Sequence, residues 1–136
     1  MPSKAQRIAG WILTGLVALF LIVVSGVPKF IDFPGKADMM AKLQIPLHLL
    51  PTLGVLEISV AVLYLIPRTA FLGAILTTGY LGGAVWTHLR ADDVWFFPII
   101  IGVLMWLSLA LRHPVIFRLA LGQGAVAPSV QGASQQ

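Results

Sequence analysis

The amino-acid sequence predicts an all-α protein: a four-helix transmembrane bundle with one longer loop between its first and second helices. Of its 136 residues, 58% are hydrophobic and only 10% are charged, whereas soluble domains average about 25% charged residues. Four apolar segments each approach the roughly 20 residues that a membrane-spanning helix needs. A soluble core of this length could not bury so much apolar surface, so a lipid bilayer is the expected solvent.

The four segments are residues 8–27, 47–66, 69–87 and 94–111. The first is uncharged and longer than the roughly 7–15 apolar residues of a secretory signal, which favours an uncleaved anchor. The second contains one acid, Glu57. We expect one membrane domain over residues 1–121 and a disordered tail over residues 122–136, which carry no charge and little that could be buried.

The connection between the first two segments, residues 28–46, is the longest one and carries most of the charged loop residues. Within it, residues 37–43 predict a short interfacial helix with Met39, Met40 and Leu43 on one side. Residues 66–68 form a tight turn, and residues 88–93 join the last two segments. Residues 115–121 are expected to lie in the membrane interface.

Charge and cysteine content exclude several classes of protein. The basic residues behind the net charge of +4 lie at segment ends, so they indicate lipid headgroups rather than nucleic acid. The absence of cysteine excludes disulfide chemistry and thiolate metal sites. With the amino terminus inside, five basic residues face the cytoplasm and four face outward, which favours cytoplasmic termini in a bacterial cytoplasmic membrane (Lys4, Arg7, Arg68, Arg112 and Arg118 against Lys29, Lys36, Lys42 and Arg90).

Glu57 is the leading candidate for a functional residue. A charged group at the centre of a bilayer costs roughly 2.5–3.5 kcal/mol on insertion scales, so an acid in this position is a functional-site hypothesis by default. The alternative is a structural acid that neighbouring hydrogen bonds satisfy. Gly54, Glu57 and Ala61 share one helical stripe, and small residues mark close helix contacts, so Glu57 should face the bundle interior.

An even number of crossings places several polar residues on the same side of the membrane. Lys29 ends the first segment, His88 follows the third, and Glu57 lies nearer to that side than to the other. The sequence therefore predicts a ligand or proton pocket formed by Glu57, Lys29 and His88, with Trp86 and Trp95 as apolar walls. The alternatives are that Lys29 snorkels to the headgroups, that His88 is an interfacial residue, and that the tryptophans belong to an interface belt.

Glycines indicate where helices come close. Gly79 and Gly83 form a G-x-x-x-G pattern on the third segment, typical of close helix packing. Packing within the chain is expected, and a homo-oligomer is the alternative. Gly54 is expected to serve the same packing role beside Glu57.

Several motifs resemble those of the DoxX-like family of small four-helix membrane proteins: Gly26-Val-Pro-Lys29-Phe, Gly54-Val-Leu-Glu57-Ile, Ile66-Pro-Arg68 and Gly83-Ala-Val-Trp-Thr-His88-Leu. The family takes its name from a subunit of a membrane thiosulfate–quinone oxidoreductase, and other members are linked to oxidative-stress systems. The resemblance implies that Lys29, Glu57 and His88 share a pocket. The chain itself carries no dinucleotide fingerprint, haem motif or cysteine pair, so no catalytic residue and no metal ligand is assigned.

The leading hypothesis is therefore a ligand-binding or accessory subunit of a quinone-linked membrane redox system. A quinone is the ligand that the pocket suggests, and a redox protein is the expected partner. Two alternatives stay open, a small proton-coupled transporter and a purely structural assembly subunit. Small multidrug exporters have four spans and one glutamate, but theirs lies in the first helix, which is uncharged here.

Overall fold

The computed structural model describes residues 1–124, which form six α-helices and no strand. The all-α prediction is confirmed. Helix α1 (Lys4–Leu19) continues through a π-helical stretch, η1 (Phe20–Gly26), and a 3-10 turn, η2 (Val27–Lys29). Then follow α2 (Lys36–Lys42), the turn η3 (Leu47–Leu49), α3 (Leu50–Leu65), α4 (Ala70–Arg90), α5 (Phe97–Arg112) and α6 (Val115–Ala120). The tail expected to be disordered lies mostly outside the described residues.

Three helical stretches of the described chain are long and apolar enough to cross a membrane: Lys4–Lys29, Leu47–Leu65 and Ala70–Arg90. The prediction of a membrane protein is thereby supported by length and composition. Helix α5 is apolar but has only 16 residues. At 1.5 Å per residue it is about 24 Å long, shorter than a hydrocarbon core of about 30 Å.

Helix ends differ from those expected because hydropathy marks the membrane rather than the helix. The first helix begins at Lys4, ahead of its apolar run, because Ser3 and Gln6 form a capping box there. Helix α4 continues to Arg90 and includes His88, which the sequence had placed in a connection. Helix α5 begins only at Phe97, with Pro98 in its first turn.

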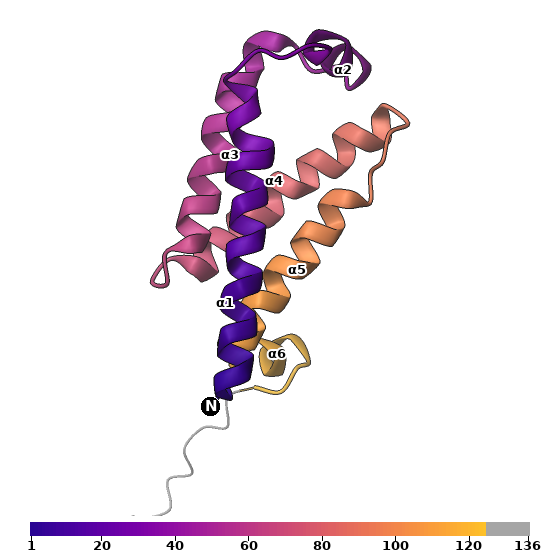
Figure 1. The fold of residues 1–136 in the computed structure, drawn as a ribbon. Helices are drawn as coiled ribbons and strands as arrows, with labels where there is room; N and C mark the ends of the chain where they lie inside the picture. The colour runs from indigo at the N-terminus through magenta and orange to yellow at the C-terminus, as the bar shows by residue number, and fades with distance from the viewer. Residues whose placement is uncertain (125–136) are drawn as a thin grey trace, which may run out of the picture.

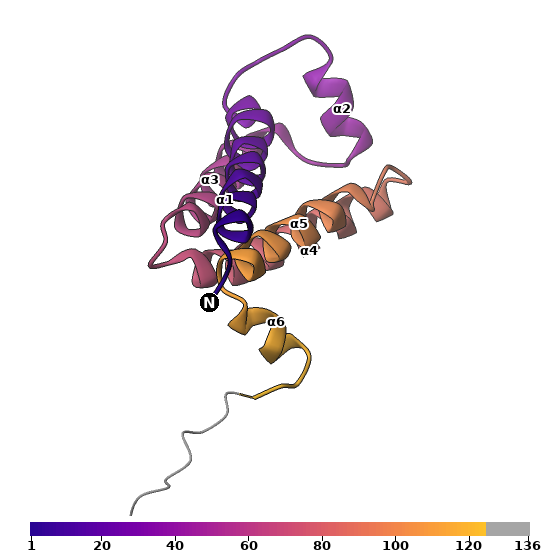
Figure 2. The same ribbon diagram turned by 60° about the horizontal axis from the view of Figure 1, so that its bottom comes forward.

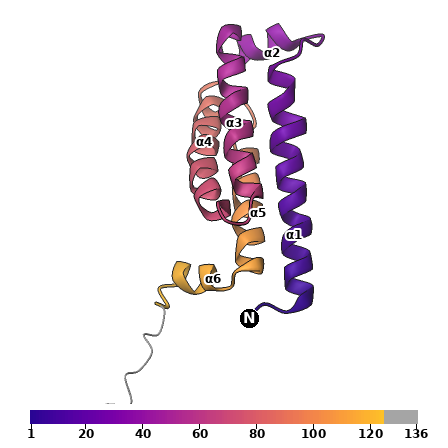
Figure 3. The ribbon, with the colours of Figure 1, turned by 90° about the vertical axis from the view of Figure 1, so that its left-hand side faces the viewer.

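The long helices form two pairs that diverge toward one end of the molecule. Figure 1 shows α1 and α3 running together while α4 and α5 lean away from them. In Figure 2, α2 stands apart from α1 and α3 on the side toward which α4 and α5 lean. Helix α6 lies at the opposite end, near the N-terminus (Figure 3). We call the end that carries α2 and the connection between α4 and α5 the open end. The end that carries α6 and the start of α1 is the closed end.

At the closed end, neighbouring helices approach so closely that their backbones are in contact. A Cβ at Gly73 would lie 2.1 Å from the Tyr64 backbone nitrogen, so α3 and α4 meet where only glycine fits. A Cβ at Gly10 would lie 2.9 Å from the Ser108 carbonyl oxygen, so α1 and α5 also approach closely there. Between these contacts, the Tyr64 hydroxyl hydrogen-bonds the Ser108 hydroxyl at 2.5 Å, and both residues are fully buried.

The glycine predictions need one correction. A Cβ at Gly79 or Gly83 would meet nothing within 4 Å, so neither glycine packs against another helix of the chain. Both are exposed, Gly79 on the outer side of α4 and Gly83 beside the space between the diverging helices, and Gly73 is the residue that makes the close contact with α3. Gly54 does lie at a close contact, since its Cβ would be 2.5 Å from the Phe30 ring.

Candidate functional site

The diverging helices leave a cavity of about 700 Å³ at the open end, which we call the main cavity. Its wall takes residues from the end of the first helix, from α2, from the first half of α3, from the second half of α4 and from the start of α5. Most of this wall is apolar. The polar side chains on it are Ser25, Lys29, Lys36, Glu57, Tyr80, Thr87 and His88.

An ion pair between Lys29 and Glu57 lies in this wall. The Lys29 ammonium donates to Glu57 Oε2 at 2.5 Å, and the side chains are 18% and 3% exposed. Lys29 also donates to the Ser25 carbonyl oxygen at 2.9 Å and to the Ser25 hydroxyl at 3.1 Å. A buried pair offsets its loss of hydration only when further hydrogen bonds complete it, and Ser25 supplies them.

Local backbone structure places Lys29 opposite Glu57. Ser25 lies in the π-helical stretch and Lys29 in the 3-10 turn that follows, so the helix changes its winding just where these side chains converge. Such π-helical irregularities occur frequently at functional sites. Gly54 also contributes, because a Cβ there would be 3.2 Å from the Lys29 Cβ. Without a side chain at Gly54, the end of the first helix can lie directly against α3.

Tyr80 joins the ion pair from α4. Its phenol interacts with the Glu57 carboxylate, and both side chains line the main cavity. Thr77, one turn earlier on α4, is fully buried and its hydroxyl has no hydrogen-bond partner. Glu57 is therefore held by Lys29 from the first helix and lies near the Tyr80 phenol of α4.

Asp93 organises a second polar group, at the rim of the cavity. Its carboxylate contacts Nδ1 of His88 at 3.1 Å and accepts from Lys42 at 3.3 Å. Arg90 donates to the carbonyl oxygens of Leu43 and Gln44 at 3.5 and 3.4 Å. The Val94 backbone N–H, then His88 and Lys42, hold the pKa of Asp93 below its usual range. These contacts fasten the end of α2 to the end of α4.

The predicted site residues fall into two groups. Lys29, Glu57 and His88 all line the main cavity. Trp86 and Trp95 do not line it and are 65% and 44% exposed. Trp86 lies on the outer side of α4, and Trp95 precedes α5 and packs edge-on against Phe96. Within residues 1–124 no three His, Asp or Glu side chains gather as a metal site would require.

Sequence reasoning did not assign Ser25, Tyr80 or Asp93 to the pocket. A signal existed for each. Ser25 is four residues before Lys29, and Tyr80 is eight residues before His88, which places both on one side of a helix. Asp93 lies on the same side of the membrane as Lys29 and His88. Nothing in the sequence indicated the burial of Arg112, whose guanidinium stacks 4.1 Å from the Trp11 ring at the closed end.

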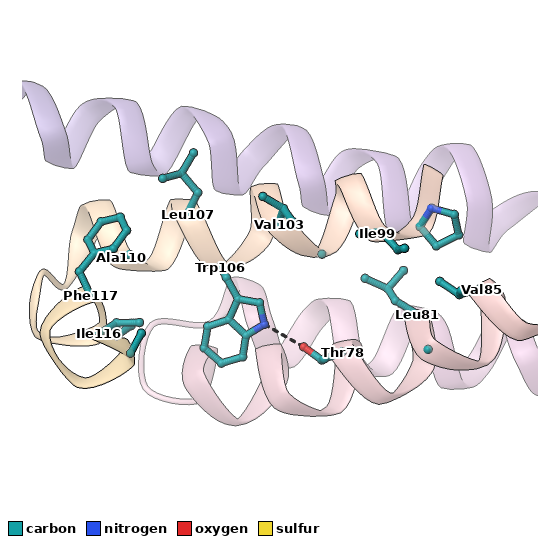
Figure 4. Close-up of a pocket in the computed structure, with 14 residues that line it drawn as sticks. Thr78, Leu81, Val85, Ile99, Val103, Trp106, Leu107, Ala110, Ile116 and Phe117 are labelled. Carbon is teal, nitrogen blue, oxygen red and sulfur yellow. Dashed lines mark hydrogen bonds between the residues drawn. The ribbon is translucent and has the colours of Figure 1, made fainter. Parts of the chain in front are cut away.

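A second hollow, the outer groove, runs along α4, α5 and α6 and measures about 620 Å³ (Figure 4). Its polar side chains are Thr78 and Trp106, and the indole N–H donates to the Thr78 hydroxyl at 2.9 Å. The groove has no charged residue in its wall. It therefore lacks the acid–base groups that distinguish the main cavity.

Comparison with known proteins identifies the family. No curated protein and no solved structure matches the chain. The sequence profile of the DoxX-like family matches residues 12–110, a range that includes Lys29, Glu57 and His88 together with the second half of α1 and most of α5. The chain therefore belongs to the DoxX-like family.

Proposed function

We propose that this protein binds an amphipathic, quinone-like molecule in the main cavity, as a ligand-binding or accessory subunit of a membrane redox system. The observation that carries the proposal is the ion pair of Lys29 and Glu57 in the wall of an otherwise mainly apolar cavity. Ligand sites are typically concave and apolar with a few convergent polar groups. The apolar wall suits a hydrocarbon tail, and the polar residues suit a ring that carries oxygen.

Glu57 is the residue that we assign to contact the polar end of the ligand. It is nearly buried and is held by Lys29. His88 lines the same cavity and also contacts Asp93 at the rim. This arrangement supports a path for protons between the rim and Glu57, with Lys29 balancing the charge of the acid.

The proposal includes four membrane crossings, with both termini on the cytoplasmic side of a bacterial membrane. The three long helical stretches cross by length, and α5 would cross as the partner of α4. The apolar and exposed residues 94–96 would extend its reach. In this topology the open end faces away from the cytoplasm, as the distribution of basic residues favours.

Ligand binding can be tested in lipid nanodiscs with a decyl-tailed benzoquinone and with its quinol. We expect saturable binding of at least one of the two. Ala84→Phe should abolish that binding, because Ala84 lines the cavity and a phenyl ring would fill it. Ser59→Ala, on the exposed side of α3, is the matched control and should bind like wild type. Wild-type binding no greater than partition into empty nanodiscs would refute the proposal.

A structural assembly role is the second candidate, because Gly79 lies on the exposed side of α4 and leaves it open to another helix. Co-purification of a stoichiometric partner that Gly79→Leu releases, without any loss of ligand binding, would favour it. Proton-coupled transport is the remaining alternative from the sequence. Solute uptake into vesicles that depends on both a pH gradient and Glu57 would favour transport over the binding role.

A further inference from the structure

The hydrogen-bond donors in the wall of the main cavity are largely engaged by the protein itself. All three N–H groups of Lys29 are used, two by Ser25 and one by Glu57. The Thr87 hydroxyl donates to the Gly83 carbonyl oxygen at 2.9 Å. Lys36 donates to the carbonyl oxygens of Ile31 at 2.6 Å and of Lys29 at 3.4 Å. A ligand therefore finds few free donors, chiefly the remaining hydrogens of Ser25 and Lys36.

The acceptors, in contrast, are incompletely used. An ionised carboxylate offers about four lone-pair sites. Lys29 occupies one site on Glu57 Oε2, and the Tyr80 phenol interacts with the same carboxylate. At least part of the capacity of Glu57 to accept hydrogen bonds is therefore open to a ligand in the cavity.

His88 adds a second acceptor. Its Nδ1 contacts Asp93 Oδ2, and because an ionised carboxylate only accepts, Nδ1 is the nitrogen that carries the hydrogen. In the neutral imidazole the other nitrogen, Nε2, then accepts. His88 therefore brings an accepting nitrogen to the wall that it shares with Glu57.

We propose that the main cavity selects ligands whose polar end donates hydrogen bonds, such as a quinol or another amphipathic phenol, over ligands whose oxygens only accept, such as a quinone. The inference rests on the proposed function and specifies its ligand class. A quinol hydroxyl donates to Glu57 without displacing Lys29. A quinone carbonyl brings its lone pairs to a carboxylate, and most of the hydrogen-bond donors in the wall already have partners.

The size of the preference follows from the charge on the acceptor. A hydrogen bond to a charged group contributes roughly twice as much as a neutral one. We therefore expect the quinol to bind at least about tenfold more tightly than a matched ligand without donors, which corresponds to about 1.4 kcal/mol.

The experiment compares three probes that share one decyl tail: the quinol, its dimethyl ether and the quinone. Binding to the wild-type protein in nanodiscs is measured under anaerobic conditions, so that the quinol stays reduced. The dimethyl ether keeps the ring and both oxygens but has no donor. We expect the quinol to bind at least tenfold more tightly than either of the other probes.

Glu57→Gln distinguishes the effect of the charged acceptor from the effect of the cavity's shape, because an amide has the shape of the carboxylate but not its charge. We expect it to reduce the quinol preference to less than threefold while the ether binds as before, and Ser59→Ala to keep the full preference. Equal or tighter binding of the quinone or the ether by wild type would overturn the inference. If the quinone or the ether bound to wild type in this way and lost its binding in Ala84→Phe, the proposed function would remain while the preference for donors would be refuted. If no probe bound saturably, both would fail.

Discussion

The same four long helices behave differently at the two ends of the molecule. At the closed end Gly73 brings the α3 and α4 backbones together, and the buried Tyr64–Ser108 hydrogen bond lies between the helices. At the open end α4 and α5 lean away from α1 and α3 (Figure 1), and an ion pair lies in the wall of the space between them. The closed end holds the bundle together, so the open end can keep an unfilled space.

The polar groups at the two ends differ in the same way. At the closed end the Ser108 hydroxyl passes its hydrogen bond on to the Met105 carbonyl oxygen at 2.7 Å, so the pair of hydroxyls is satisfied internally. At the open end Glu57 retains acceptor capacity and lies in the wall of a cavity. Burial alone therefore does not distinguish the candidate site from the closed end. The candidate site is distinguished by a buried acid that keeps unused hydrogen-bonding capacity.

The variant with the largest expected loss of stability tests whether the ion pair of Lys29 and Glu57 stabilises the open end. Lys29→Met leaves the Glu57 carboxylate buried without a cation, and breaking a buried pair from one side costs about 3–5 kcal/mol. The free energy of unfolding, measured by denaturant titration in mixed micelles, should fall by that amount. The double variant Lys29→Met/Glu57→Leu should recover most of it.

Lys4→Met is the control for this experiment, because Lys4 is exposed and lies at the start of α1. Its unfolding free energy should match that of wild type. A Lys29→Met protein as stable as this control would show that the pair contributes nothing to holding the diverging helices.

The next effect tests the close packing of the closed end. Gly73→Ala places a methyl group against the backbone of Tyr64, which cannot move aside as a flexible side chain could. Overpacking of this kind typically costs about 1–3 kcal/mol, and we expect the upper part of that range. The measurement is the same denaturant titration.

Gly79→Ala is the matched control on the same helix, where the added methyl group meets nothing within 4 Å. Alanine is favoured over glycine in a helix by roughly 0.8–1.0 kcal/mol, so this variant should equal wild type or exceed it in stability. If both variants lost stability equally, the closed end would not be the more tightly packed region.

The smallest effect on stability is expected at the rim, where Asp93 fastens α2. Asp93→Asn should leave the unfolding free energy unchanged but loosen α2, because the charged contacts with Lys42 and His88 are lost. The absence of cysteine allows a single fluorophore at Asp38→Cys on α2, whose anisotropy should fall in the Asp93→Asn background. Asp92→Asn is the matched control and should keep the anisotropy of wild type.

The pH dependence of this attachment follows from the direction of the pKa shift. The contacts lower the pKa of Asp93 from its ordinary value of 3.8. A lowered value means that the attachment is complete above pH 3.8 and is lost only as the pH falls through the lower value of the folded protein. Anisotropy that declined already near neutral pH would contradict the assignment of Asp93.

Much of the fold was predictable because the length of each apolar segment must match the thickness of the bilayer. The all-α class and the short helix near Met40 followed from hydropathy and turn residues. Helix ends were less predictable. Helix α1 begins at Lys4, earlier than expected, because a capping box lies there. Helix α4 ends at Arg90, later than expected, because no helix-breaking residue precedes it. Hydropathy carries no information about either event.

The candidate site was predictable in its residues and not in its shape. Lys29, Glu57 and His88 were chosen from their chemistry and from the side of the membrane they share, and all three line the main cavity. Which tryptophans would line it depends on helix rotation, and Trp86 faces outward instead. The role of Gly79 and Gly83 also depended on rotation, because several glycines on one helix offer competing contact faces.

Composition and the spacing of charges are local properties, so they were enough to indicate a membrane protein with one acid among its apolar segments. The contact of α4 with α3 at Gly73, the divergence of the helices and the cavity beside Glu57 became evident only from the folded chain. That outcome depends on how the helices are rotated and tilted against one another, which no local pattern of residues specifies.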